Sequence, residues 1–359
     1  MTEETATRPV RPGEELPEGN LRKFLTGAGL LDSYDSPIRV SQFKNGYSNL
    51  TYLLGFEEKE YVLRRPPVGA PKRGHDMGRE YEVLHKLRQV FDKTPLVYVF
   101  SEDPEVLGAP FYIMEKVDGI ILSAREAHKR NPSPEAFQAI SNTWLHTLID
   151  LHKVDYNAAG LGALGRPEGY VERQVANWGK QYLAAVTENV DSAHKVMAWM
   201  QDHQPKTYQH SLIHNDYKYD NLVFKDDSWQ EVAAILDWEM CTLGDPLMDL
   251  GTSLGYWTTA SDPEFMKLGL PSPTVLPGNP LRSEIVGAYA AGSGSDVSNL
   301  VFYYAYGLFK VAVIAQQIYF RYKHGYTSDP RFSELDKASA LCCDTALRAI
   351  QKNQIDDLH

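Results

Sequence analysis

Three short apolar runs stand out in the second half of the chain, and each is followed by polar residues. They occupy residues 211–213, 222–224 and 232–236. Short apolar runs bounded by polar turn residues are typical of buried strands. The first is followed by Asp216, Asn221 comes just before the second, and the third leads directly to Asp237. The pattern therefore predicts that these three side chains lie at the mouths of neighbouring strands.

The first third of the chain has a strand-rich pattern and the rest a helical one. Strands are predicted at 38–43, 50–56, 61–64, 96–100 and 111–116, with helices at 21–31 and 77–91. Apolar residues at spacings of three and four then predict helices at 134–154, 171–186, 193–203, 300–322 and 332–351. Between them, Asp262–Pro280 is rich in Pro and Gly and has no usable period, so either a substrate loop or a plain surface excursion fits it.

This change of pattern predicts three parts. Residues 1–18 have few apolar side chains and are expected to form a flexible leader. Residues 19–117 then form a small lobe and residues 118–359 a large one. A chain of 359 residues is long enough for two such lobes.

Charge and cysteine content narrow the class of protein. The net charge of −11 argues against a nucleic-acid partner, because phosphate backbones attract Lys and Arg. The three cysteines lack metal-ligand spacing and cannot form a disulfide framework, and no secretory signal pattern opens the chain, so a cytoplasmic protein is expected. The apolar run 300–320 is interrupted by Lys310, Gln316 and Gln317, which favours a core helix over a membrane span.

The polar residues after the predicted strands fit phosphoryl transfer. That reaction uses one carboxylate to orient or deprotonate a hydroxyl, and an Asn oxygen with a second carboxylate to hold Mg²⁺. Any one of these residues alone would be an ordinary turn residue. Their combination, with both spacings and the strands beside them, favours a site.

The motif H-x-D-x-x-x-x-N, followed 16 residues later by Asp237, resembles the catalytic core of the protein-kinase-like superfamily. D-W-E at 237–239 and G-D-P-x-x-D-L at 244–250 are similar to the aminoglycoside phosphotransferase family. The run GRPEGYVERQVANW, at 165–178, resembles the kinase-like N-terminal domain of certain acyl-CoA dehydrogenase family members. These resemblances imply an α+β, bilobal protein-kinase-like fold, with an antiparallel β small lobe and a mainly helical large lobe.

The resemblance also implies roles in the large lobe. Asp216 would be the catalytic base or hydroxyl-orienting group, and Lys218 could reach the γ-phosphate. Asn221 and Asp237 would ligate Mg²⁺. Asp249 would bond the backbone of the catalytic loop and fix its shape.

For ATP, the resemblance assigns residues of the small lobe. Ser48 and Asn49 would bond phosphate oxygens. Arg64 stands where related folds carry a phosphate-binding lysine, and the sequence leaves open whether Arg64 or Arg65 takes that role. Glu80 would pair with this cation, while the backbones of two hinge residues, Glu115 and Val117, would hold adenine.

The expected activity is ATP-dependent phosphorylation of a hydroxyl on a small molecule. The cations Lys72, Arg73, Arg166 and Arg173 would suit an anionic acceptor, such as a hydroxy acid or a hydroxyacyl-CoA, better than an aminoglycoside. A catalytically silent Mg·ATP-binding module is the alternative, whereas the lack of an A-P-E signature disfavours a protein kinase. No membrane partner is expected, and aromatic-rich helices are compatible with a homodimer.

Overall fold

The chain forms two compact units. The computed structural model describes residues 6–44, 49–56, 58–67 and 76–358. One unit comprises Met1–Asp118 together with Ala233–Met240, and the other comprises Gly119–Val232 and Cys241–His359. A short segment of the second half of the chain, which includes Asp237, thus belongs to the first unit.

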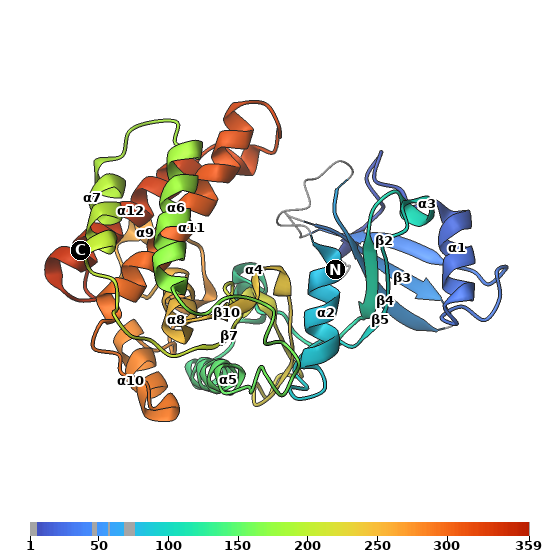
Figure 1. Ribbon diagram of the computed structural model, residues 1–359, viewed down its shortest axis with the longest axis horizontal. Coiled ribbons are helices and arrows are strands. Elements are labelled where there is room, and N and C mark those ends of the chain that lie inside the picture. Colours follow the sequence, from blue (N-terminus) through green and yellow to red (C-terminus); the bar gives the residue numbers. More distant parts are fainter. Residues whose placement is uncertain (1–5, 45–48, 57, 68–75, 359) are drawn as a thin grey trace. The chain divides into compact units, whose positions relative to one another are not determined.

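The first unit is built on a six-stranded antiparallel sheet with strand order β1-β2-β3-β4-β6-β5. The strands are β1 (Thr7–Arg8), β2 (Arg39–Phe43), β3 (Leu50–Phe56), β4 (Lys59–Arg65), β5 (Val97–Ser101) and β6 (Phe111–Glu115). Its helices are α1 (Glu18–Gly27), α2 (Met77–Leu87) and α3 (Pro104–Leu107). The sheet lies between α1 and α2 (Figure 1).

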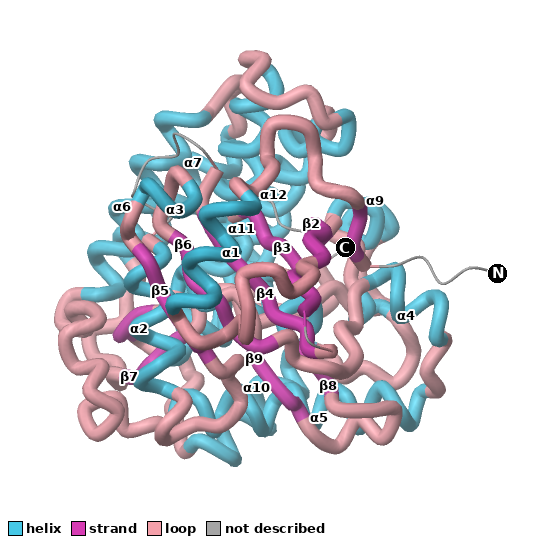
Figure 2. Tube along the Cα trace, turned by 90° about the vertical axis from the view of Figure 1, so that its right-hand side faces the viewer, coloured by secondary structure: helices cyan, strands magenta, loops and turns pink. Residues whose placement is uncertain are grey.

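Alternation along β4 decides which side chain faces which helix. Tyr61 and Leu63 belong to the same apolar cluster as Leu21 and Leu25 of α1, which crosses this face of the sheet (Figure 2). Successive side chains of a strand point to opposite faces. Val62 and Arg64, which alternate with them along the strand, therefore point to the face covered by α2.

Part of the expected leader is attached to the sheet. β1 pairs antiparallel with β2, placing Thr7 opposite Phe43. Farther along, the Tyr52 hydroxyl donates to the Glu14 carbonyl at 2.7 Å. The described residues from 6 onward thus do not form the loose leader that their composition suggested, because backbone pairing needs no apolar side chains.

The second unit is mainly helical, as predicted. Its helices are α4 (Ala124–Arg130), α5 (Pro134–His152), α6 (Tyr170–Ala185), α7 (Asp191–Asp202), α8 (Pro246–Gly255), α9 (Glu264–Gly269), α10 (Arg282–Ser293), α11 (Leu300–Lys323) and α12 (Leu335–Lys352). Helix α11 packs against α6, α7, α8 and α12 and forms the centre of the unit. Strand β7 (Ser211–Ile213) pairs antiparallel with β10 (Thr242–Gly244), and β8 (Leu222–Phe224) also belongs to this unit. Strand β9 (Val232–Ile235) lies almost entirely in the stretch that belongs to the first unit.

Two glycines bring α8 and α11 into backbone contact. A Cβ atom on Gly307 would lie 1.9 Å from the Gly251 carbonyl oxygen, and one on Gly251 would lie 2.2 Å from the Tyr303 carbonyl oxygen. Only a residue without a side chain fits at either position. The contact matters because α8 carries Asp249 and α11 carries Lys310.

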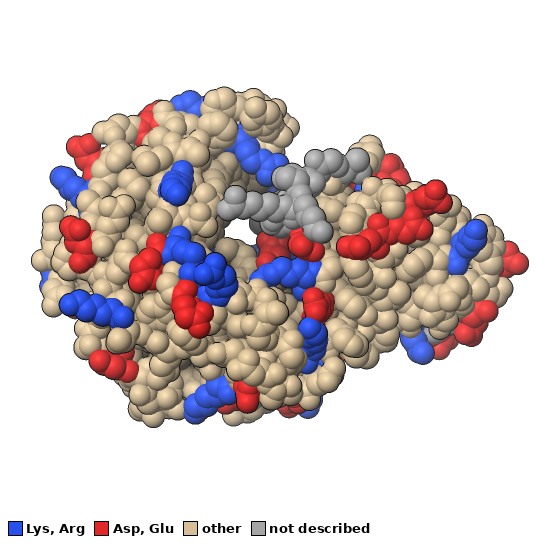
Figure 3. Space-filling model, in the orientation of Figure 1, with Lys and Arg blue, Asp and Glu red and all other residues tan. Residues whose placement is uncertain are grey.

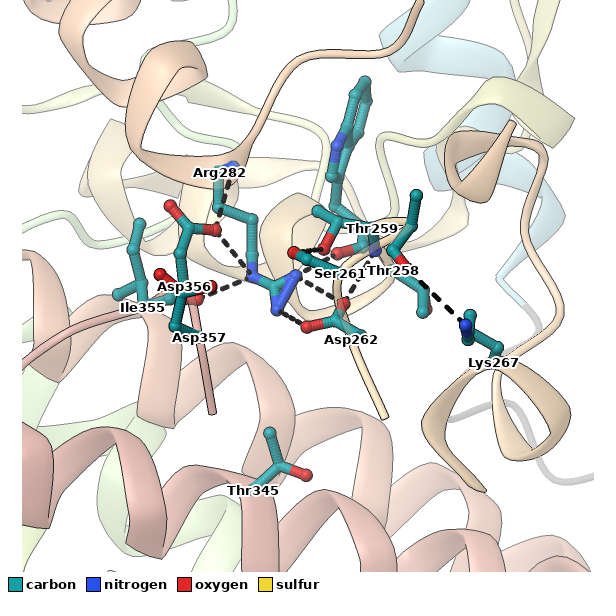
Figure 4. A network of polar contacts seen from close by, with 12 residues as sticks. Thr258, Thr259, Ser261, Asp262, Lys267, Arg282, Thr345, Ile355, Asp356 and Asp357 are labelled. Atoms are coloured by element: carbon teal, nitrogen blue, oxygen red, sulfur yellow. Dashed lines mark hydrogen bonds and ion pairs between the residues drawn. The ribbon is translucent and has the colours of Figure 1, made fainter. Parts of the chain in front are cut away.

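A buried arginine joins the start of α10 to two distant segments (Figure 4). The Arg282 guanidinium forms a bidentate pair with Asp262 and donates to the carbonyl oxygens of Trp257 and Ile355. Arg282 itself is fully buried. The Pro- and Gly-rich segment expected at 262–280 is thereby anchored, and it contains α9.

No helix among the described residues is long and apolar enough to cross a membrane. In helix α11, the polar residues Lys310 and Gln316 are buried inside the unit. On the visible face of the helical unit, basic and acidic side chains are interspersed (Figure 3). The three cysteines, Cys241, Cys342 and Cys343, are buried and free.

Candidate functional site

In the first unit, three carboxylates converge on Arg64. Its guanidinium lies 2.7 Å from Glu80 Oε1, 2.9 Å from Asp237 Oδ1 and 3.7 Å from Glu239 Oε2. We call Arg64, Glu80, Asp237 and Glu239 the Arg64 cluster. The expected ion pair between Arg64 and Glu80 is confirmed.

The neighbouring arginine points the other way. The Arg65 guanidinium donates to the Leu107 carbonyl oxygen of α3 at 2.9 Å. Arg64 is therefore the arginine that shares a face with Glu80 and Asp237. The alternation of β4 separates the two arginines in this way, which the sequence alone did not show.

Burial gives the Arg64 cluster its electrostatic character. Glu80 is 1% exposed, and burial raises the pKa of its carboxyl group while Arg64 opposes the rise. Burial acts to lower the pKa of Arg64, but the Glu80 carboxylate raises it well above its usual range. The guanidinium stays charged at any ordinary pH, so the cluster keeps a buried positive charge beside the Glu80 carboxyl group.

Asn49 and Asp237 are also held in this unit. The Asn49 amide nitrogen donates to Glu239 Oε2 at 2.8 Å. Asp237 lies two residues after the end of β9 and has a positive φ of 67°, in the left-handed region that side chains disfavour. Ser48, which was predicted to bond phosphate oxygens together with Asn49, lies outside the described residues.

The predicted adenine-binding residues lie at the end of β6 and just after it. The backbone N–H of Glu115 donates to the Leu96 carbonyl oxygen at 2.8 Å, and the Glu115 carboxylate accepts from the Leu96 N–H at 2.8 Å. Val117 follows and is partly buried. A ligand here would have to use groups other than the Glu115 N–H.

In the second unit, residues 214–221 form what we call the HND loop. The Lys218 ammonium lies 3.0 and 2.9 Å from the two Asp216 carboxylate oxygens. The Asn221 amide nitrogen donates to the Asp216 carbonyl and to its Oδ2, both at 2.8 Å. The loop thus brings together three of the predicted site residues.

A tyrosine that the sequence did not indicate borders this group. The Lys218 ammonium lies 4.7 Å from the centroid of the Tyr256 ring. Although burial opposes the change, the Asp216 carboxylate raises the pKa of Lys218. Burial and Asp216 also raise the pKa of Tyr256. Both groups therefore keep their protons at neutral pH.

Asp249 bonds the backbone of the HND loop, as expected. Its carboxylate accepts from the backbone N–H groups of His214, at 2.6 Å, and Asn215, at 2.7 Å. Burial would raise the pKa of Asp249, but its hydrogen bonds with His152 and with the His214 backbone hold it below the ordinary value. An ionised carboxylate thus fixes the start of the loop.

His152 and Lys310 also reach this loop, and the sequence gave neither a role. His152 Nε2 lies 3.2 Å from Asp249 Oδ2, and its Nδ1 lies 2.7 Å from the Tyr289 hydroxyl. The Lys310 ammonium donates to the Asn215 carbonyl oxygen at 2.6 Å. Both come from helices that are distant in sequence, so spacing alone could not reveal them.

Of the cations that suggested an anionic acceptor, two lie outside the described residues and Arg173 bonds its own loop. Lys72 and Arg73 lie outside the described residues. The Arg173 guanidinium donates to the carbonyl oxygens of Arg166 and Glu168, so it braces its own loop. The structure thus gives Arg173 a local structural task.

The family is decided by comparison with known proteins. The model of the phosphotransferase enzyme family matches residues 39–270. This chain belongs to that family. Its relatives include mouse acyl-CoA dehydrogenase family member 10, which is 34% identical over 334 residues that cover 90% of this chain and 30% of the relative. The chain therefore spans about a third of the length of this curated relative.

Solved structures of phosphotransferases share the fold. A protein described as a candidate aminoglycoside phosphotransferase from Ralstonia eutropha matches with a TM-score of 0.77 and 29% identity, over 94% of this chain and 99% of that chain. The GDP complex of aminoglycoside 2'-phosphotransferase-IIIa matches with a TM-score of 0.59 and 14% identity, over 91% and 98% of the two chains. The predicted protein-kinase-like fold is confirmed.

Proposed function

We propose that this phosphotransferase moves the γ-phosphate of ATP to a hydroxyl group of a small molecule. The observation that carries the proposal is the HND loop, in which Asp216 is held by Asn221 and Lys218 on a backbone fixed by Asp249. Positioning and electrostatic stabilisation supply most of the catalysis in phosphoryl transfer. A rigidly held carboxylate is what orienting an acceptor hydroxyl requires.

Arg64, Asn49 and Ser48 would contact the phosphates in this proposal, with Glu80 keeping the Arg64 guanidinium in place. Adenine would meet the carbonyl of Glu115 and the N–H of Val117, because the Glu115 N–H is already used. The related enzyme solved with GDP supports a nucleotide as donor.

Asn221 and Asp237 would hold Mg²⁺. The Asn221 amide nitrogen is bonded to Asp216, which leaves its oxygen as the ligand atom, and Asp237 adds a carboxylate. Oxygen ligands suit Mg²⁺. No group of three or more His, Cys, Asp or Glu side chains in the described part of the chain could hold a metal alone, so phosphate oxygens and water would complete the coordination. Bound Mg²⁺ neutralises charge on the β- and γ-phosphoryl oxygens.

Asp216 would then accept a hydrogen bond from the acceptor hydroxyl and aim its oxygen at the γ-phosphorus. Lys218, which keeps its proton, would release one of its bonds to Asp216 and meet the transferred phosphoryl group. For the acceptor we propose a hydroxy acid or hydroxyacyl thioester, which is supported by the likeness to acyl-CoA dehydrogenase family member 10.

The first test is calorimetric titration of Mg·ATP into the wild type and Asp237→Ala. We expect the dissociation constant to rise at least about tenfold in the variant. Asp227→Ala is the matched control, because Asp227 pairs with Arg130 at the surface and should leave binding unchanged. A wild type that does not bind Mg·ATP would refute the proposal.

ADP release identifies the acceptor. We expect turnover with hydroxyacyl thioesters or hydroxy acids, none with aminoglycosides, and none with any acceptor in Asp216→Asn. The reverse preference would refute the anionic acceptor. Binding of Mg·ATP without ADP release from any acceptor would support the silent module, which the engagement of Arg64 by protein carboxylates favours.

A further inference from the structure

Lys310 is an unusual residue for the middle of a core helix. Only 1% of it is exposed, yet no ion pair to it exists among the described residues. Its ammonium donates to the Asn215 carbonyl oxygen at 2.6 Å and approaches the Asn215 side-chain oxygen at 3.3 Å. It also lies 5.6 Å from the centroid of the Trp178 ring. Burying a charge against neutral groups is costly, so a specific task for it is expected.

The contacts of Asn215 indicate what this task is. This residue has a φ of 69°, in the left-handed region that a side chain disfavours. Its backbone N–H is bound by Asp249 at 2.7 Å, and its carbonyl oxygen by Lys310 at 2.6 Å. Its side-chain amide lies within 3.3 Å of the Tyr170 hydroxyl. The two peptide groups that flank the Asn215 Cα are thus held by opposite charges, the one before it by Asp249 and the one that leads to Asp216 by Lys310.

We propose that Lys310 is a positioning residue, whose hydrogen bond to the Asn215 carbonyl oxygen fixes the peptide that carries Asp216 in the orientation needed for transfer. The proposal rests on the proposed function for its catalytic consequence. Its structural part, that Lys310 holds the HND loop, stands without that function. If the peptide rotates, the Asp216 carboxylate moves with it, and a misplacement of about 1 Å costs about 10²-fold in rate.

The charge of Lys310 gives this arrangement a recognisable pH dependence. Burial lowers the pKa of Lys310 to about 8, against the opposing effect of the Asp249 carboxylate. The other charged groups acting on it are Asp216, which favours the ammonium, and Lys218, which disfavours it. Lys218 and Tyr256 have raised pKa values and keep their protons through this range. The hydrogen bond from Lys310 to the Asn215 carbonyl oxygen should therefore weaken as the pH rises through about 8, because the ammonium loses its charge.

The test compares the full-length wild type with Lys310→Met, Lys310→Gln and the control Lys323→Met. Lys323 lies at the end of the same helix and its side chain is 41% exposed. We expect Lys310→Met to lower kcat about 100-fold with unchanged Mg·ATP affinity. Lys310→Gln keeps a donor for Asn215 and should recover part of kcat. The wild type should lose kcat above pH 8, and neither Lys310 variant should show that limb.

Hydrogen exchange of the amides of residues 214–216 separates this inference from the proposed function. We expect faster exchange there in Lys310→Met than in the wild type or Lys323→Met, whether or not any acceptor is turned over. Should Lys310→Met fail to fold, the same two measurements are made on Lys310→Gln, with a smaller rise in exchange and a smaller loss of kcat expected. Unchanged exchange in the HND loop, or a kcat and pH profile like those of an active wild type, would overturn the proposal.

Discussion

At the scale of single residues, Arg64 and Arg65 show how one step along a strand separates two tasks. Both are buried, but Arg64 meets carboxylates and Arg65 meets the carbonyl oxygen of Leu107. The guanidinium of Arg64 is wide enough to touch Glu80 and Asp237 together, which a lysine ammonium does less readily. An arginine at this position thus makes more contacts with the protein than a lysine would.

Arg64→Met should weaken Mg·ATP binding and lower the free energy of unfolding by about 3–5 kcal/mol, because Glu80 would stay buried without its cation. Arg65→Met is the matched control, as it makes the same change on the opposite face. It should cost stability but leave nucleotide affinity intact. Urea denaturation and calorimetry measure the two effects. Nucleotide affinity lost in Arg65→Met and kept in Arg64→Met would contradict the assignment.

The sequence was informative about site residues that share a short motif. Asp216, Lys218 and Asn221 lie within one loop, so their spacing alone predicts that they meet. Lys310 and His152 come from helices α11 and α5, and no local pattern connects them to the loop. Lys310 gave one signal, since a lysine inside an apolar helix needs a partner, but the sequence could not name that partner.

At the scale of elements, periodic segments and short apolar runs were predicted well, and several segments with neither pattern were missed. The helices at 134–154 and 300–322 are present as α5 (Pro134–His152) and α11 (Leu300–Lys323). The strand β10 (Thr242–Gly244) has three residues, too few for a period, and depends on pairing with β7. Helix α10 was missed because its small residues and weak apolar stripe resemble a loop.

Arg282 at the start of α10 bonds segments that are distant in sequence, so its loss should lower the stability of the unit more than the loss of a surface ion pair does. Arg282→Met would leave Asp262 buried without its bidentate partner, and we expect the free energy of unfolding to fall by about 3–5 kcal/mol. The control is Arg331→Met, whose ion pair with Asp329 is exposed and should contribute at most about 1 kcal/mol. Equal urea midpoints for the two variants would show that the anchor contributes little.

At the scale of the whole molecule, the chain passes back into its first unit for a short stretch. Ala233–Met240 belongs there, where the Ile235 N–H donates to the Lys93 carbonyl oxygen at 2.8 Å. The same stretch brings Asp237 and Glu239 to Arg64. The sequence alone assigned it to the large lobe, since a return of eight residues leaves no change in composition.

A fragment that ends at Asp118 should therefore be incomplete. It would lack the buried Trp238 and two of the three carboxylates of the Arg64 cluster. We expect residues 1–118 to show poor amide dispersion by NMR, and the same fragment with residues 233–240 joined through a flexible linker to show more. Identical, well-dispersed spectra for both fragments would mean that the returning stretch is dispensable for folding.

The glycine contact between α8 and α11 limits how such a protein can diversify in evolution. Gly251 and Gly307 set the separation of the helices that carry Asp249 and Lys310. A methyl group at either position would push the helices apart, and with them the two supports of the HND loop. Sequence change is therefore expected in the surrounding segments rather than at these two glycines. We expect Gly251 and Gly307 to stay fixed while the residues around them change.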